Sequence, residues 1–148
     1  MYQHILVPTD GSKLSQKAIR TAVRLAGAVG ARVTGVYVVP PYSPPMYGDG
    51  IIYGQFISPG RYRESVKREG KKSLAVVEVE AQTASVESGE TMLAANSPWE
   101  GIIRTAKAKK CDLIVMASHG RRGLTGLLLG SETTKVLTHS KIPVLVCR

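Results

Sequence analysis

The chain has 148 residues, of which 20 are Lys or Arg and 11 are Asp or Glu, so its formal net charge is +9; 43% of it is hydrophobic. This length supports one domain with a core large enough to need neither disulfides nor a structural metal. The apolar fraction excludes a disordered chain, and no apolar run approaches the roughly 18 residues of a membrane span. The first residues lack the pattern of a signal peptide, so we expect one cytoplasmic domain, residues 1–148.

The positive charge does not indicate a nucleic-acid-binding protein. Basic residues outnumber acidic ones by 11 to 4 in residues 1–74 and by 9 to 2 in residues 101–148, but residues 75–100 hold five acidic residues and no basic one. The densest basic clusters fall in helical patterns, and one Phe and one Trp do not form a stacking platform for single strands. We therefore expect neither a nucleic-acid partner nor a membrane partner.

The two cysteines, Cys111 and Cys147, have no metal-ligand spacing and indicate no disulfide framework. Both flank apolar runs, so we expect small buried side chains, with a redox role as the alternative.

The first third of the chain shows a strand, a helix and a second strand. The apolar run from His4 to Val7 predicts a buried strand, and Pro8 to Ser12 predicts a turn. A helix follows, with Ser12 as its N-cap and Gly30 at its end, because apolar residues recur there every three or four positions. Val33 to Val39 predicts the second strand.

A long loop rich in Pro, Gly and Tyr follows, at about residues 40–60. Loops of about twenty residues inside compact domains are uncommon and are usually functional lids or disordered excursions. Its aromatic residues either cover a ligand or a partner, or pack the loop onto its own domain.

The rest of the chain continues the alternation. A helix is expected from Tyr62 to Ala84, in which Gly70 costs about 1 kcal/mol relative to Ala, and a strand from Glu87 to Ala94. Ser97, Pro98 and Glu100 predict a helix start with a capping box. A strand from Asp112 to Ala117, a glycine-rich loop from Ser118 to Gly130, a helix from about Ser131 and a strand from Ile142 to Val146 complete the pattern, and Pro143 favours an edge position for that last strand.

Five apolar strands alternating with helices predict an α/β fold with a parallel sheet covered on both faces. Ligands of such sheets bind beyond the carboxyl ends of the strands at the switch point, which draws attention to the turn at 8–12, the end of the second strand and the loop at 117–131. Glycines at 120, 123, 126 and 130, before a helix start, form a candidate phosphate site with Arg121 and Arg122 nearby. Ordinary turn formation is the alternative, and the spacing matches neither the P-loop nor GxGxxG.

Four segments of the chain resemble the universal stress protein family: HILVPTDGS at 4–12, DLIVMASHGR at 112–121, LLLGS at 127–131 and PVLV at 143–146. The match runs in order over essentially the whole chain. The resemblance implies a Rossmann-like open parallel sheet of five strands in the order 3-2-1-4-5, and a homodimer formed through the last strand, Ile142 to Val146. In one branch of the family it also implies a bound ATP with Mg²⁺ or Mn²⁺. That branch carries Gly, two residues, Gly, nine residues, Gly and then Ser or Thr; Gly120, Gly130 and Ser131 fit this spacing, but Ala117 replaces the first glycine.

The resemblance also implies the roles of individual residues in the nucleotide site. They are Pro8, Thr9 and Asp10 at the adenosine end, with Asp10 toward the ribose or, indirectly, the metal; Val38, whose backbone contacts adenine; Met116, Ala117, His119 and Gly120 in the wall and phosphate loop, with Arg121 adding charge; and Gly130, Ser131, Glu132 and Thr133 at the phosphate-binding helix start. Asp10 acting only as a brace for the turn, His119 as an exposed loop residue and Ser131 as only an N-cap remain alternatives.

No catalytic set is visible, because hydrolysis requires a positioned base or a metal-held water and Asp10 is the only carboxylate placed in the expected pocket. We therefore expect a homodimeric stress-response regulator that binds ATP or another adenine nucleotide and acts on an unknown regulatory protein partner. The alternatives are a nucleotide-free dimeric interaction module and a slow ATP-hydrolysing enzyme.

Overall fold

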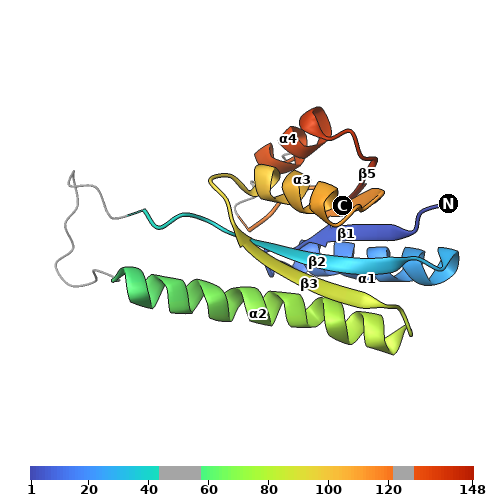
Figure 1. The fold of residues 1–148 in the computed structure, drawn as a ribbon, viewed down its shortest axis with the longest axis horizontal. Helices are drawn as coiled ribbons and strands as arrows, with labels where there is room; N and C mark the ends of the chain where they lie inside the picture. Colours follow the sequence, from blue (N-terminus) through green and yellow to red (C-terminus); the bar gives the residue numbers. More distant parts are fainter. Residues whose placement is uncertain (44–57, 122–128) are drawn as a thin grey trace.

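The computed structural model describes residues 1–43, 58–121 and 129–148. Within them, strands and helices alternate along the chain (Figure 1): β1 (His4–Pro8), α1 (Lys13–Val29), β2 (Arg32–Val39), α2 (Pro59–Thr83), β3 (Ser88–Ala94), α3 (Pro98–Ala108), β4 (Leu113–Ala117), α4 (Ser131–His139) and β5 (Val144–Cys147). The strands form one parallel sheet in the order β3-β2-β1-β4-β5. The predicted α/β fold and its strand order are confirmed.

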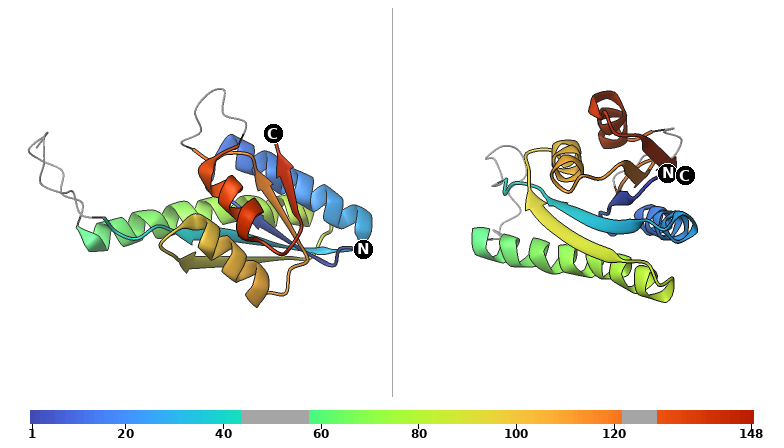
Figure 2. Two further views of the ribbon diagram at one scale, coloured as in Figure 1. Left: turned by 90° about the horizontal axis from the view of Figure 1, so that it is seen from above. Right: turned by 45° about the vertical axis from the view of Figure 1, so that its right-hand side comes forward.

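Helices cover both faces of this sheet. The two views of Figure 2 show α1 and α2 on one face and α3 and α4 on the other. The first pair packs over Ile5 and Val115, and the second pair over Leu6 and Ile114. Because successive side chains of a strand point to opposite faces, both sets must be apolar, which explains why β1 and β4 show no polar alternation.

The carboxyl ends of β1 and β4 lie side by side in the middle of the sheet, with Ile5 paired to Leu113. The chain leaves β1 toward α1 on one face and leaves β4 toward α4 on the other. The segments that follow these two strands therefore diverge, and they form the switch point of the fold.

Both ends of α1 form as predicted. The Ser12 side chain accepts a hydrogen bond from the N–H of Ser15 at 3.1 Å, and Gly30 ends the helix in the left-handed conformation at φ 72°. A residue without a Cβ adopts this backbone geometry at little cost.

The start of α2 lies at Pro59, earlier than the predicted start at Tyr62. Ser58 caps the helix by accepting from the N–H of Arg61 at 3.2 Å. Ser58 followed by Pro59 is a helix-start signal. The sequence pattern places it in the loop, because the residues before it are also rich in Pro and Gly. The Tyr62 hydroxyl donates to the carbonyl of Pro40 at 3.0 Å and its ring contacts Tyr42 edge-on, so the first part of the predicted loop packs against α2. Residues 44–57 of that loop lie outside the described residues.

The capping box predicted at the start of α3 is wrong, because Ser97 makes no side-chain cap hydrogen bond. The carboxylate of Glu132, from α4, instead accepts from the N–H of Trp99 at 2.8 Å. A tertiary contact thus satisfies a free donor of the first turn, the N–H of Trp99, whereas the capping box would have used the N–H of Glu100.

The last strand lies at the edge of the sheet, as predicted, although it begins at Val144. Pro143 precedes β5, and its carbonyl accepts from the N–H of Ile114 at 2.9 Å. The proline therefore removes no donor from within the strand.

Cys111 and Cys147 are both buried, as predicted. Burial and the neighbouring Asp112 carboxylate raise the pKa of the Cys111 thiol to about 11. This thiol is therefore protonated near neutral pH, which does not suit a redox role. Among the described helices, none combines the length and the apolar character that crossing a bilayer requires.

Gly70 is a packing residue of α2 and not only a weak point of the helix. A Cβ placed on it would lie 2.5 Å from Met92 Cε and 2.9 Å from Tyr37 Cδ1. The missing side chain lets α2 lie close against β2 and β3.

Replacing Gly70 with Ala is therefore expected to lower the free energy of unfolding by about 1–3 kcal/mol, because overpacking against Tyr37 and Met92 outweighs the gain in helix propensity. Gly60→Ala is the matched control, since Gly60 lies in the same helix with nothing within 4 Å of an added Cβ. Urea unfolding followed by circular dichroism measures both variants. Equal stability of Gly70→Ala and the wild type would show that the Met92 and Tyr37 side chains move aside freely.

Candidate functional site

The turn after β1 is held together by Thr9. Its N–H donates to the carbonyl of Val36 at 2.9 Å, and its hydroxyl accepts from the N–H of Gly11 at 3.2 Å and lies 3.1 Å from the Ser15 hydroxyl. Thr9 is only 6% exposed, so its side chain braces the turn from inside. Pro8, the last residue of β1, lies at the same end of the sheet.

Asp10 connects this turn to the loop after β4. Its Oδ1 accepts from the N–H of Ser12 at 3.0 Å, and its Oδ2 accepts from the N–H of Arg121 at 2.8 Å. Burial raises the pKa of this carboxyl. Hydrogen bonds from Ser12, Arg121 and Ser15 together outweigh that effect, so the pKa of Asp10 is lower than its ordinary value. Asp10 is therefore ionised near neutral pH and braces the turn, as the structural alternative predicts.

Gly120 lies so close to this carboxylate that a side chain does not fit. A Cβ built on it would be 2.7 Å from Asp10 Oδ2. Gly11, on the other side of the turn, has a φ of 80°, which favours glycine. The backbone at Gly120 thus lies directly against the Asp10 side chain at the switch point.

The Arg121 side chain points toward α2. One of its terminal nitrogens, Nη2, lies 2.5 Å from Glu69 Oε1 and would lie 2.9 Å from a Cβ on Gly11. The two charged side chains are 48% and 45% exposed, and such surface pairs contribute only about 0–1 kcal/mol. Arg121 is therefore held near the turn by a contact that is easily exchanged.

The far end of the loop closes onto the start of α4. The N–H of Gly130 donates to the carbonyl of Ser118 at 2.7 Å, and a Cβ on Gly130 would lie 3.2 Å from His119 Cα. Gly130, not Ser131, is the N-cap residue, and α4 has no side-chain cap. The first N–H groups of a helix have no partner within it, and no described residue accepts from those of Ser131, Glu132 and Thr133, so the start of α4 presents donors next to the loop.

The side chains of Glu132 and Thr133 take structural roles. The Glu132 carboxylate caps α3 and forms an ion pair with Lys135 at 3.5 Å. The Thr133 hydroxyl donates to the carbonyl of Ala117 at 3.0 Å. Of these two residues, only the backbone N–H groups remain for an anion at the helix start.

Two other predicted residues place their side chains in the core. Met116 is 5% exposed and packs between the sheet and α3 and α4. Val38 packs there too, and a Cβ on Gly101 would lie 2.8 Å from both of its methyl carbons. The Val38 side chain is partly buried against this cluster, and the backbone role that the resemblance implies stays a prediction.

His119 is partly exposed, and its Nδ1 lies 3.1 Å from the Ser118 hydroxyl. The loop positions Arg122, Gly123 and Gly126, which the sequence also singles out, lie outside the described residues.

The structure thus brings Thr9, Asp10 and Gly120 together at the switch point, with Arg121 beside them. Sequence reasoning missed Glu69 and Ser73 of α2, which border the Arg121 guanidinium and Gly11. No local pattern marks them, because Glu69 lies far from Arg121 along the chain. Within the described part of the chain, no three His, Cys, Asp or Glu residues gather as a metal site.

A profile of the universal stress protein family matches residues 1–148. The chain belongs to the universal stress protein family. Universal stress protein MJ0531 of Methanocaldococcus jannaschii is 35% identical over 151 residues, which cover 100% of this chain and 83% of the relative. Universal stress protein YxiE of Bacillus subtilis is 35% identical over 149 residues, with 100% of both chains covered.

Solved structures of universal stress proteins share the fold. One from Archaeoglobus fulgidus in complex with dAMP superposes with a TM-score of 0.72 at 21% identity, covering 99% of this chain and 98% of that one. Another, in complex with cAMP, superposes with a TM-score of 0.68 at 24% identity, covering 98% and 95%.

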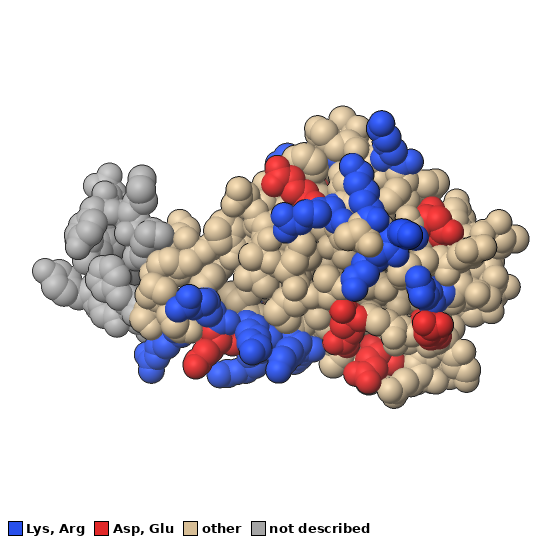
Figure 3. Space-filling view, viewed as in Figure 1, with Lys and Arg blue, Asp and Glu red and all other residues tan. Residues whose placement is uncertain are grey.

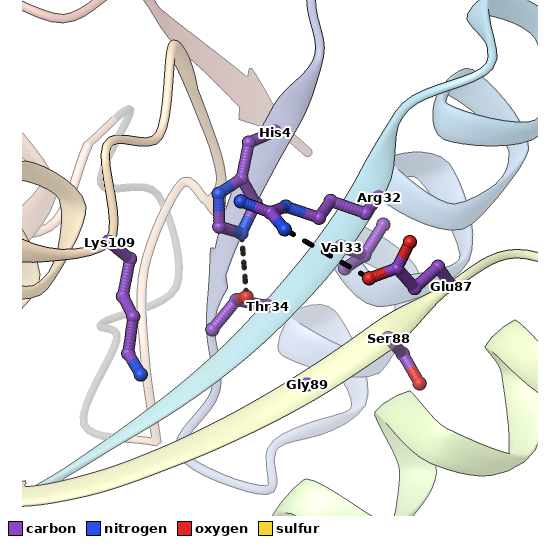
Figure 4. A pocket seen from close by; sticks show the side chains of 8 residues that line it. All are labelled: His4, Arg32, Val33, Thr34, Glu87, Ser88, Gly89 and Lys109. Atoms are coloured by element: carbon purple, nitrogen blue, oxygen red, sulfur yellow. Dashed lines mark hydrogen bonds and ion pairs between the residues drawn. The ribbon is translucent and has the colours of Figure 1, made fainter.

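A cavity of about 190 Å³ lies at the opposite end of the sheet of this universal stress protein, where the strands begin. Figure 4 shows Arg32 reaching between His4 and Glu87, with Lys109 across the opening. His4 is 6% exposed, and its Nε2 lies 2.7 Å from the Thr34 hydroxyl. Burial first, and then the Arg32 charge, lower the pKa of His4 from its ordinary 6.5.

Acidification from about pH 7 to 5 is therefore expected to lower the free energy of unfolding. The unfolded chain takes up a proton at His4 near pH 6.5, whereas the folded chain does so only at lower pH. His4→Gln removes this difference and should flatten the pH dependence. Urea unfolding midpoints across this pH range measure the pH dependence of stability. An equally steep profile for His4→Gln would contradict the assignment.

Asp10 and Asp112, whose pKa values are also lowered, add a further loss of stability below about pH 4.

Proposed function

We propose that this universal stress protein is a cytoplasmic stress-response regulator that binds ATP or another adenine nucleotide and works as a homodimer. The observation that carries the nucleotide proposal is the cradle at the switch point. There Gly120 approaches Asp10 and, after nine intervening residues, Gly130 leads into the start of α4, which has no side-chain cap. A glycine-rich loop beside free helix N–H groups suits phosphates.

Different parts of the site would bind the phosphates and the ribose of the nucleotide. The N–H groups of Ser131, Glu132 and Thr133 at the start of α4 would hold phosphate oxygens, and the turn at Thr9 and Asp10 would face the ribose. Glu132 directs its carboxylate to α3 and pairs it with Lys135, which reduces its repulsion of an anion at the helix start. The relatives with bound dAMP and cAMP support an adenine compound with at least one phosphate.

Ala117 is compatible with this site, although the ATP-binding branch has glycine at that position. Its methyl group belongs to the apolar cluster between the sheet and the helices α1 and α2, and the residue is 9% exposed. A side chain that lies in the core does not occupy the phosphate loop.

A divalent ion, Mg²⁺ or Mn²⁺, would depend mainly on the phosphates. Among the described residues no cluster of metal ligands exists, and each Asp10 oxygen already accepts a backbone hydrogen bond. Asp10 would therefore contribute through a bound water. Its lowered pKa also makes it a poor general base, so we propose at most slow ATP hydrolysis.

Purified protein is expected to carry an adenine nucleotide, detected by mass spectrometry after denaturation, and to bind Mg-ATP in a calorimetric titration. Ser131→Asp should weaken ATP binding at least about tenfold, because its carboxylate competes with the phosphates at the helix start. Binding of adenosine should change little.

Ser131→Asn is the matched control, since it has the same shape without the charge, and it should retain most of the affinity. Asp at this position also favours the helix dipole, so the variant is expected to fold. If the wild type carries no adenine nucleotide and Mg-ATP gives no heat, the protein is a nucleotide-free interaction module and the proposal fails.

The homodimer proposal rests on the outer edge of β5. This strand pairs with β4 on one side only, so its other edge offers unpaired backbone groups. Leu145 of β5 is 36% exposed, and Leu137 of α4 is 41% exposed. A second copy pairing through the predicted segment, Ile142 to Val146, would cover both the backbone edge and Leu145.

Light scattering at micromolar concentration is expected to give twice the 15.9 kDa of one chain. Leu145→Arg should shift the mass toward 15.9 kDa, because a desolvated charge opposes the contact. Val79→Arg, at another exposed apolar position that lies on α2, should leave the dimer intact. A wild type that runs as a monomer would overturn the proposal.

A further inference from the structure

The first half of α2 concentrates positive charge on the surface. Residues 59–72 contain six basic and two acidic residues, whereas residues 73–83 contain Glu78 and Glu80 and no basic residue. The basic side chains are all exposed, and we call them the basic half of α2: Arg61, Arg63, Lys67, Arg68, Lys71 and Lys72. Figure 3 shows a basic cluster over this part of the molecule, at the lower left, next to an acidic region.

No ion pair in the described part of the chain involves the basic half. The ion pairs found there are Arg20–Glu80, Arg32–Glu87, Arg121–Glu69 and Lys135–Glu132. One of the two acidic residues of the segment, Glu69, is already engaged by Arg121. The helix dipole adds to the positive potential, because the first turn of α2 contains Arg61 and no acidic residue.

The surface has a defined length and an apolar end. Lys67, Arg68 and Lys71 line a shallow groove together with Glu64. With 3.6 residues per turn, Arg61, Arg68 and Lys72 lie along one side of the helix over about 16 Å. The same side continues to Ala75 and to Val79, which is 61% exposed.

We propose that the basic half of α2 is a docking surface for an acidic segment of a protein partner, with an aliphatic side chain of that segment placed against Val79. Charge complementarity favours acidic side chains along the helix, and a desolvated contact at one end sets the register. This inference does not depend on nucleotide binding.

The length of the surface favours a protein segment over larger polyanions. A flat anionic membrane or a DNA duplex laid along α2 would also meet Glu78 and Glu80 on the second half of the helix, and like charges oppose that contact. The apolar face of α2 is buried against the sheet, so the helix cannot insert it into lipid. A segment of about ten residues can keep its acidic side chains on the basic half and reach the second half only at Val79, with an aliphatic side chain.

The probe is a fluorescein-labelled peptide of about twelve residues that is rich in Glu and carries two Leu. Fluorescence anisotropy with the full chain should show saturable binding that weakens as salt rises. The double variant Arg68→Glu with Lys72→Glu should bind at least about tenfold more weakly. Amide resonances of α2 should shift on titration.

Arg24→Glu with Lys107→Glu is the matched control, because it lowers the net charge equally at exposed positions on α1 and α3, and it should keep the affinity. Equal losses in both double variants would show diffuse attraction and overturn the proposal. Tighter binding of a DNA duplex or of anionic vesicles than of the peptide would overturn it as well. If circular dichroism shows that the charge reversal on α2 unfolds the chain, the double variant Lys67→Gln with Lys71→Gln replaces it. This variant should lose less affinity for the peptide than the charge reversal. Unchanged binding in it contradicts the proposal.

Discussion

The carboxylate of Asp10 joins two segments that the sheet topology alone leaves unconnected. β1 and β4 lie side by side, but the chain leaves them toward opposite faces. Asp10 accepts from the N–H of Ser12 in one segment and from the N–H of Arg121 in the other. Gly120 must lack a side chain for the second contact to form. The shape of the candidate site therefore depends on one ionised carboxylate and one glycine.

Most of the remaining site is built from backbone groups. Val38 and Met116 place their side chains in the core, Thr9 braces its own turn, and Thr133 binds the end of β4. The donors at the start of α4 are backbone N–H groups of the first helical turn, and they do not depend on which side chains are present. A site built in this way depends on its glycines and its turn more than on particular side chains, and the methyl group of Ala117 lies in the apolar cluster under α1 and α2.

The sequence predicts the fold well because apolar periodicity is a local property that tertiary packing here reinforces. It fails where a distant group takes over a local role. At the start of α3, Ser97 makes no cap hydrogen bond, and Glu132 of α4 accepts from the N–H of Trp99. In α2, Gly70 leaves room for Met92, which helix propensity does not reveal. The family resemblance proposes the positions of the site residues, and these stay predictions. It does not give their contacts, because the pair formed by Arg121 and Glu69 depends on how α2 crosses the sheet.

The same pair connects the two surfaces proposed for this protein. Glu69 lies within the basic half of α2 in sequence, and its charge is compensated only while Arg121 remains beside it. Phosphates at the switch point would attract Arg121, and a released Glu69 would then reduce the positive charge along α2. Nucleotide binding and docking of an acidic segment would in that case oppose each other, and linkage requires that each weaken the other by the same factor. An exposed ion pair suits this role, because exchanging its partner costs little free energy.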